Sequence, residues 1–158
     1  MMLFYFRCFI FFLVAIVTEI QCKNAALVII DVQLCFLPNG SLAVPDGDQV
    51  IPVINDIRSK HKDKFSLVVL SQDWHCSDHI SFASQHNEKN PFEYIQLLYD
   101  DKGLLCDSTH NCSVVKYNIT QRLWPDHCVI NSTSADISSK LTRSFNDLII
   151  KKATTAKV

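Results

Sequence analysis

Three short runs of apolar residues recur along the chain at intervals that leave room for connecting elements. Residues 25–31 read AALVIID, residues 65–72 read FSLVVLSQ and residues 147–151 read DLIIK. Runs that are apolar on both faces are typical of buried parallel strands, since helices cover both sides of such a sheet. The pattern therefore predicts three strands.

Two segments between these runs have helical spacing. Residues 48–60 carry apolar side chains three and four positions apart, and Pro52 must lie in the first turn, where its missing N–H costs little. Residues 134–145 predict a shorter helix with Ser134 or Asp136 near its cap. The stretch 76–133 has no clear period, so we expect a long, mostly irregular loop that folds over a site.

The resulting order of strand, helix, strand, loop, helix and strand indicates an α/β fold with a parallel sheet and right-handed crossovers. Ligands bind beyond the carboxyl ends of the strands in open sheets of this kind. Asp31, Asp73 and Lys152 stand at the ends of the three predicted strands. Many strands end on a polar residue, but three of three, with histidines nearby, favours a functional site.

The amino-terminal residues 2–22 are predicted to be a signal peptide. Arg7 precedes an uncharged run from Cys8 to Thr18, which is about 11 residues long and too short to cross a bilayer core of roughly 30 Å comfortably. An uncleaved signal anchor and a buried core segment are the alternatives. We therefore divide the chain into a signal peptide over 1–22, with an approximate boundary, and one α/β domain over 23–158.

Other features agree with a secreted glycoprotein. Sequons for N-glycosylation begin at Asn39, Asn111, Asn118 and Asn131. Cys106 and Cys112 bracket a short polar loop and either form a local disulfide or remain two unpaired thiols. No stable membrane span is expected.

Composition narrows the function further. The chain has 158 residues, of which 48% are hydrophobic and 20% charged, a balance that argues for one folded domain. Its formal net charge of −1 gives no electrostatic reason to expect a nucleic acid as partner.

A cluster of possible metal ligands follows the second predicted strand. In the sequence Asp73-Trp74-His75-Cys76-Ser77-Asp78-His79, extended backbone places Asp73 and His75 on one side, and His79 returns from a turn. His127 could add another imidazole from the far end of the loop. A carboxylate with imidazoles is a common ligand set for zinc, manganese or iron, although loop histidines are also common without a metal.

Asp31 follows a strand of pure hydrocarbon, so its carboxylate is either exposed or held by a cation. Lys152 is the natural partner, because the adjacent Lys151 should point to the opposite face of its strand. Such a pair could poise a proton donor or acceptor, or serve only as a structural ion pair.

Five motifs occur in a fixed order over residues 25–152. They are Ala26–Gln33 with Phe36, Gly40–Pro45 with Gly47 and Asp48, Ser71–His75, Asp78–Ala83, and Leu123–Val129. Together they resemble the nicotinamidases (pyrazinamidase type) of the isochorismatase-like hydrolase family. The resemblance implies an isochorismatase-like, Rossmann-like fold, here incomplete, and hydrolysis of nicotinamide to nicotinate and ammonia for NAD salvage.

The resemblance also implies roles for single residues. Asp31 would be the general base and acid of a reaction that passes through a cysteine thioester, and Lys152 would favour the thiolate beside it. A divalent metal, with zinc expected first and manganese or iron as alternatives, would coordinate the pyridine nitrogen. Its implied ligands are Asp73, His75, His79 and His127. Phe36 and Trp124 match positions that line the ring pocket.

Some positions depart from the family pattern. The family's nucleophile follows the strand after the lysine motif, whereas this sequence ends at Val158 and none of its cysteines occupies a matching position. We therefore expect a truncated, inactive and poorly soluble chain that lacks the nucleophile and the oxyanion hole. Cys35 stands where the family usually has an acid, and Ala153 stands where it commonly has glycine.

Two other functions remain open at this point. One is a related isochorismatase-like hydrolase that acts on another carboxamide or on isochorismate, although the full metal set argues against isochorismate. The other is a secreted, non-catalytic module that binds a metal or a nicotinamide-like ligand.

Overall fold

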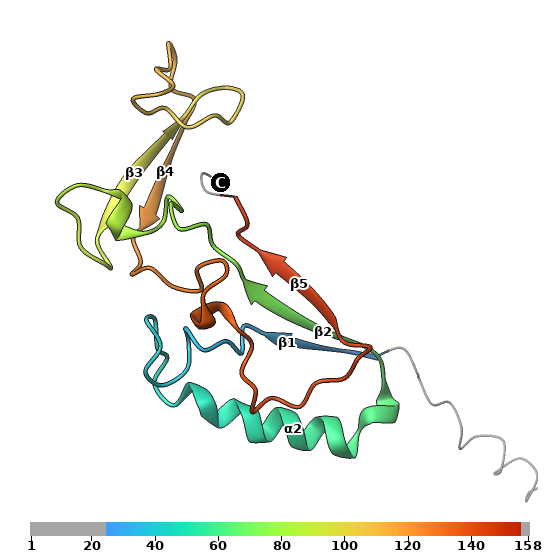
Figure 1. The fold of residues 1–158 in the computed structure, drawn as a ribbon. Helices are drawn as coiled ribbons and strands as arrows, with labels where there is room; N and C mark the ends of the chain where they lie inside the picture. The colour runs from blue at the N-terminus through green and yellow to red at the C-terminus, as the bar shows by residue number, and fades with distance from the viewer. Residues whose placement is uncertain (1–24, 156–158) are drawn as a thin grey trace, which may run out of the picture.

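A computed structural model describes residues 25–155 of the chain. The predicted signal peptide over 1–22 lies outside these residues. Six elements are longer than a single turn (Figure 1): β1 Ala25–Ile30, α2 Val50–Lys60, β2 Phe65–Asp73, β3 Tyr94–Tyr99, β4 Tyr117–Arg122 and β5 Leu148–Lys152. No helix among the described residues is both long and apolar enough to cross a bilayer.

The three predicted strands form one parallel sheet in the order β1-β2-β5, which confirms the α/β fold class. The register pairs Ile30 with Ser71 and Asp73 with Lys152, so the carboxyl ends of all three strands meet at one edge. Asp73 and Lys152 are the last residues of β2 and β5, whereas Asp31 directly follows β1.

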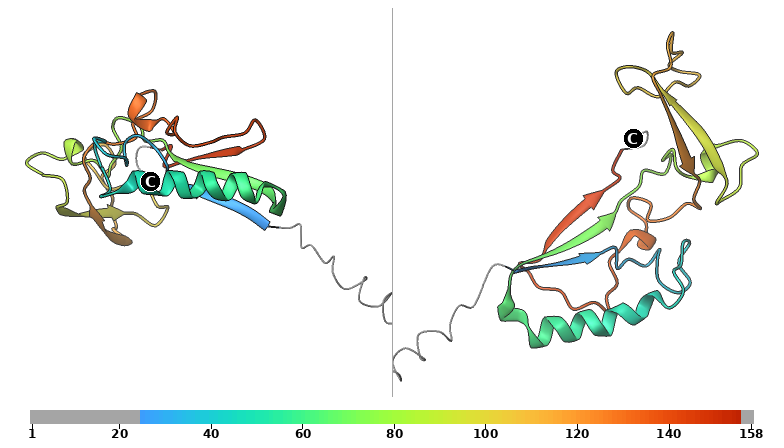
Figure 2. Two further views of the ribbon diagram at one scale, coloured as in Figure 1. Left: turned by 90° about the horizontal axis from the view of Figure 1, so that it is seen from below. Right: turned by 180° about the vertical axis from the view of Figure 1, so that it is seen from behind.

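Helix α2 covers one face of this sheet, as the two views of Figure 2 show. Pro52 is its third residue, in the first turn as predicted. Ile51 of the helix packs with Ile29 of β1 and Leu70 of β2 in the main hydrophobic core. Leu141 and Ile137 complete this core from the segment that precedes β5.

The predicted helix over 134–145 is wrong. Only Thr133–Ala135 forms a 3-10 helix, and the bonds that follow, from the Leu141 N–H to Ser138 and from the Asp147 N–H to Ser144, close isolated turns. Asn55 of α2 explains part of the difference: its amide donates to the Lys140 carbonyl at 2.9 Å and accepts from the Thr142 N–H at 2.8 Å. A side chain from a distant helix thus satisfies backbone groups that a local helix would have used.

The loop over 76–133 is less irregular than predicted. β3 and β4 pair as an antiparallel hairpin that projects from the three-stranded sheet (Figure 1). The disulfide Cys106–Cys112, which the sequence left open, lies in the connection between these two strands.

Candidate metal centre and active site

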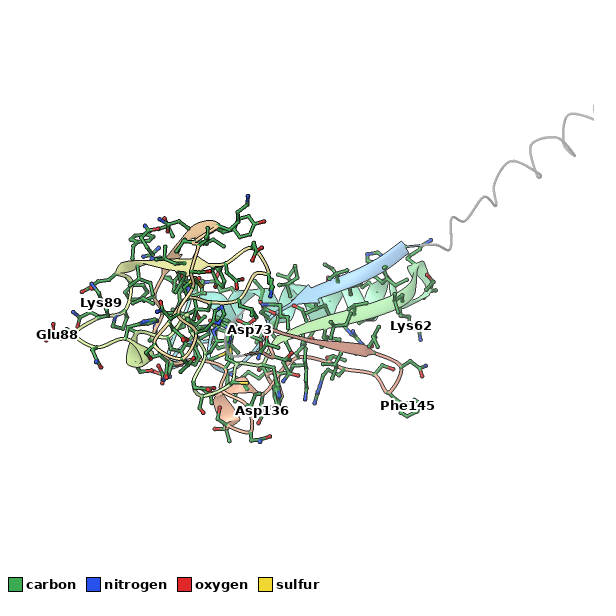
Figure 3. The ribbon with its side chains drawn as sticks, turned by 90° about the horizontal axis from the view of Figure 1, so that it is seen from above. Lys62, Asp73, Glu88, Lys89, Asp136 and Phe145 are labelled. Carbon is green, nitrogen blue, oxygen red and sulfur yellow. A yellow bond between two sulfur atoms is a disulfide. The ribbon has the colours of Figure 1, made fainter. Side chains whose placement is uncertain are left out.

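Three of the four predicted metal ligands gather at the carboxyl edge of the sheet. One ligand atom from each of Asp73, His75 and His127 lies within 4.8 Å of the others, and all three residues are buried. The Asp73 Oδ2 atom is 3.5 Å from His75 Nε2 and 3.8 Å from His127 Nε2. Figure 3 shows Asp73 where the sheet meets the loops, far from Phe145 at the other end of the sheet.

Local backbone geometry brings His75 and His127 together. The His75 N–H donates to the Cys128 carbonyl at 3.1 Å, and the Ile130 N–H donates to the His75 carbonyl at 2.8 Å. The residues after β2 are therefore bonded to the segment that carries His127, 52 positions later in the sequence.

His79, the fourth predicted ligand, borders this group. Its ring centroid is 4.4 Å from that of His75, and its side chain is buried. Nδ1 lies 2.8 Å from the Ser81 hydroxyl, while Nε2 has no hydrogen-bond partner among the described residues. His79 thus has one nitrogen held by a neighbour and the other free for a metal, an arrangement typical of metal-binding histidines.

The His127 imidazole fits a metal in the same way, whereas His75 differs. His127 Nδ1 lies 2.8 Å from the Pro125 carbonyl, which fixes the ring and leaves Nε2 toward Asp73. His75 Nδ1 is buried without a hydrogen-bond partner among residues 25–155. Since an unpaired buried polar atom is costly, the orphaned Nε2 of His79 supports a divalent metal at this site, and His75 faces the Asp73 carboxylate with its other nitrogen, Nε2.

The charge states suit a cation. Burial opposes ionisation of Asp73, but hydrogen bonds from His75 and Lys152 outweigh it and lower the pKa of this carboxyl to about 2. Burial, followed by the electrostatic effect of the neighbouring His75 and His127 imidazoles, lowers the pKa of His79 to about 4. Burial also lowers the pKa of His127. At neutral pH the site therefore offers a carboxylate with neutral imidazoles at His79 and His127.

The predicted partner of Asp31 is confirmed. Lys152 Nζ lies 2.9 Å from Asp31 Oδ2, and the Ser71 hydroxyl donates to Asp31 Oδ1 at 2.6 Å. Lys151 points elsewhere, with its Nζ 3.6 Å from the centroid of the Trp74 ring. Both Asp31 (φ 52°) and Ala153 (φ 57°) have left-handed backbone conformations at this edge.

Lys152 also contacts the Asp73 carboxylate, a bond that the sequence did not predict. Desolvation disfavours its charged form, but hydrogen bonds to Asp73 and Asp31 outweigh this and raise the pKa of Lys152. One ammonium group therefore connects the proposed base to the proposed metal centre.

Phe36 and Trp124, the two residues predicted to line the ring pocket, lie in different surroundings. The Phe36 ring centroid is 5.7 Å from that of His127, and Phe36 and Asp31 both line a cavity of about 310 Å³ with Val44 and Val50. The Trp124 ring packs instead against Phe92 and Arg122. Of the two, only Phe36 lines this cavity.

Sequence reasoning missed three contributors to the site. Phe82 is fully buried, and its ring lies 5.3–5.7 Å from the rings of His75, His79 and His127. The Gln33 amide bonds to the backbone of Asp73 and Ala135. The third is a disulfide between Cys35 and Cys128. Phe82 and Gln33 lie inside the family motifs, and only their burial would have indicated these contacts.

Comparison with known proteins agrees with this geometry. No protein-family profile matches the chain. A nicotinamidase of Acinetobacter baylyi is 39% identical over 132 residues, which are 84% of this chain and 51% of that protein. The chain is homologous to nicotinamidases over these matched residues. It spans about half the length of the curated relatives it matches.

Solved nicotinamidase-type structures share the fold. Yeast nicotinamidase bound to the inhibitor nicotinaldehyde superposes with a TM-score of 0.66 at 27% identity, over 83% of this chain and 57% of that one. A pyrazinamidase of Pyrococcus horikoshii in complex with zinc superposes with a TM-score of 0.55 at 30% identity, over 83% of this chain and 52% of that one.

Proposed function

We propose that the protein is a nicotinamidase, which hydrolyses nicotinamide to nicotinate and ammonia. The observation that carries this proposal is the junction of two groups at one sheet edge. The cluster Asp73–His75–His127 and the pair Asp31–Lys152 are joined through Lys152, which contacts both carboxylates. A cation that orients the ring beside a pair that transfers protons suits the hydrolysis of a heterocyclic carboxamide.

The four ligands proposed for the metal are Asp73, His75, His79 and His127. When bound, zinc would coordinate the pyridine nitrogen and fix the orientation of the ring. Zinc is favoured because a carboxylate with three imidazoles suits it, and because the related Pyrococcus horikoshii pyrazinamidase was solved with zinc. Phe36, whose ring lies beside His127, is proposed to line the ring pocket.

Asp31 is proposed to move the proton. It would accept the proton of a cysteine thiol, which attacks the carboxamide carbon, and would deliver that proton to the amide nitrogen as the C–N bond breaks and ammonia leaves. Water, giving a proton to the same carboxylate, would then cleave the resulting thioester to nicotinate and restore the thiol. Lys152, 2.9 Å from Asp31, would favour the thiolate by its positive charge. The Ser71 hydroxyl would hold the Asp31 carboxylate in place.

We propose that the nucleophile is none of the cysteines in residues 25–155. Four of these are paired in disulfides, and Cys76 lies beside the metal-ligand motif with its thiol 3.3 Å from the Thr154 carbonyl. The same observation favours a second candidate function, a non-catalytic module that binds a metal or a nicotinamide-like ligand. A related hydrolase of another carboxamide is the third candidate.

Export is part of the proposal. Asn39, Asn111, Asn118 and Asn131 are all exposed, so each sequon is accessible to glycosylation. Two disulfides in one chain support an oxidising compartment.

Calorimetric titration of the zinc-loaded protein with nicotinamide, combined with an assay of ammonia release, tests these functions. We expect zinc-dependent binding of nicotinamide, which Asp73→Asn abolishes and Asp126→Asn, an exposed carboxylate bonded to Ser84, leaves intact. Ammonia release is expected when the family's nucleophile segment, taken from the Acinetobacter baylyi relative, is joined to this chain, and Asp31→Asn should abolish it. Zinc binding without any affinity for nicotinamide would refute the nicotinamidase proposal.

A further inference from the structure

The two disulfides among the described residues have different surroundings. Cys106 and Cys112 are six residues apart in the connection between β3 and β4. Cys35 and Cys128 are 93 residues apart, and both are fully buried. Each member of this second pair is next in sequence to a residue of the proposed site, Phe36 in one case and His127 in the other.

Cys128 makes bonds to two of the proposed metal ligands. It is joined to His127 by a peptide bond, and its carbonyl accepts the His75 N–H at 3.1 Å. Its backbone is in the left-handed region (φ 45°), which a residue other than glycine adopts only when its surroundings hold it there. The position of Cys128 therefore affects His127 directly and His75 through one hydrogen bond.

Cys35 provides a fixed point for this bond. Its N–H donates to the Ser134 carbonyl at 2.8 Å, and its own carbonyl accepts from the Leu42 N–H at 3.0 Å. The disulfide lies in a buried cluster with Ala135, Phe36 and Trp74. The disulfide thus joins the loop of Cys35, whose backbone N–H and carbonyl are both hydrogen-bonded, to the loop that carries His127.

We propose that the Cys35–Cys128 disulfide is a positioning element of the metal centre, so that affinity for the metal depends on this bond. The proposal rests on the metal site described under the proposed function. A ligand loop that is already ordered loses little conformational freedom when the metal binds, and this raises affinity. Cys35 and Cys128 act through His127 and His75 and contact no substrate.

The test compares two variants that each remove one disulfide. Mass spectrometry of unreduced peptides first establishes both pairings in the secreted protein. Zinc affinity is then measured by competition with a chromophoric chelator for the unmodified chain, C35S/C128S and C106S/C112S. We expect C35S/C128S to bind zinc roughly 10- to 100-fold more weakly, the usual effect of losing a group that orients a ligand.

The matched control C106S/C112S should stay within about twofold of the unmodified chain, because that pair contributes no contact to the ligands. Cobalt gives an independent reading. The visible spectrum of bound Co²⁺ should change in C35S/C128S and not in the control, since it reports the geometry of the ligands rather than overall stability. If C35S/C128S does not fold, C35A/C128V, which keeps the contact apolar, takes its place.

The outcomes separate the two proposals. If the unmodified chain binds no zinc, the proposed metal site itself is wrong. If it binds zinc and C35S/C128S matches it in affinity and cobalt spectrum, the positioning role is refuted and the metal site stands. Free thiols at Cys35 and Cys128 would equally overturn the positioning role. So would a result in which C35S/C128S and C35A/C128V are both unfolded while C106S/C112S folds.

Discussion

The open face of the sheet and its carboxyl edge distribute polar and apolar side chains in opposite ways. Val28, Ile30, Leu148 and Ile150 project from the face that α2 does not cover, and between 49% and 67% of each remains exposed. At the edge, the polar residues Gln33, Asp73, His75, His79 and His127 are buried. Buried polar groups need hydrogen bonds or a cation to stabilise them, and exposed apolar groups lack an apolar cover.

The two regions are nonetheless parts of one structure. Side chains two positions apart on a strand share a face, so Val69, Ser71 and Asp73 of β2 lie on the same side as Leu148, Ile150 and Lys152 of β5. The open apolar face therefore leads directly to the Asp31–Lys152–Asp73 contacts. The comparison indicates that the edge requires a cation and that the open face requires an apolar cover.

The largest effect on zinc affinity is expected when the carboxyl edge of the sheet loses the negative charge of Asp73. Asp73→Ala should weaken zinc binding by more than about 100-fold, because even groups that only orient a ligand contribute roughly 10- to 100-fold. It also removes one of the two carboxylates that hold Lys152. Chelator competition measures the affinity, and Asp126→Ala is the control. Equal zinc affinity for both variants would mean that Asp73 is not a ligand.

Acidification should destabilise the metal-free protein through His79. Its pKa of about 4 in the folded chain lies below the ordinary value of 6.5, so the unfolded chain binds the proton more readily. The stabilising contribution is complete above pH 6.5 and is lost as the pH falls toward 4. The loss amounts to about 3 kcal/mol at roughly 1.4 kcal/mol per pKa unit.

Urea unfolding at several pH values, with a chelator present, measures this loss. His79→Gln should flatten the stability profile between pH 6.5 and 4, whereas the exposed His61, replaced in the same way, should leave it unchanged. A profile that keeps its slope in His79→Gln would assign the acid sensitivity to other groups.

Replacement of Gln33 should lower both the stability of the protein and its zinc affinity, although Gln33 is no metal ligand. Its side chain donates to the carbonyls of Asp73 and Ala135 and accepts the Asp73 N–H, each at 2.8 Å. Gln33→Leu leaves these buried groups unpaired and should lower the free energy of unfolding by about 2–3 kcal/mol. Because Asp73 also loses its support, zinc affinity should fall roughly tenfold.

Asn55 offers a matched control for this variant. Its amide also connects two distant segments, but at the Lys140–Thr142 stretch, away from the edge. Asn55→Leu is expected to lower stability with zinc affinity unchanged. If both variants reduce zinc affinity equally, Gln33 has no specific role in placing Asp73.

These contacts show where sequence reasoning succeeds and where it stops. The three strands and the meeting of Asp31, Asp73 and Lys152 were predictable, because apolar runs indicate parallel strands whose carboxyl ends share an edge. The wrongly predicted helix over 134–145 and the missed disulfide between Cys35 and Cys128 have one cause. In both cases the structure depends on partners far away in sequence. Local spacing contains no information about which distant residue completes such a bond.

Ala153 is expected to have a smaller effect on stability. Its φ of 57° places it in the left-handed region, where a β-carbon costs roughly 1–2 kcal/mol, and the family commonly has glycine there. Ala153→Gly removes this cost but increases the freedom of the unfolded chain, so we expect a net gain of about 0.5–1 kcal/mol in urea unfolding. Ala43→Gly, at a position without positive φ, should lose stability instead. A loss at both positions would exclude strain at Ala153.

The smallest effect on stability is expected from a substitution on the open face of the sheet. Ile30 is 67% exposed, so Ile30→Thr should change the free energy of unfolding by no more than about 0.5 kcal/mol. Ile29, its neighbour on the covered face, is 3% exposed, and Ile29→Thr should cost at least about 2 kcal/mol, because it buries a hydroxyl in the core. Light scattering should also show less aggregation for Ile30→Thr, since the apolar patch becomes smaller. If Ile30→Thr destabilised the protein as strongly as Ile29→Thr, Ile30 would be buried in solution. An apolar partner would then cover the open face, and the face would not be the bare surface with which the carboxyl edge is contrasted.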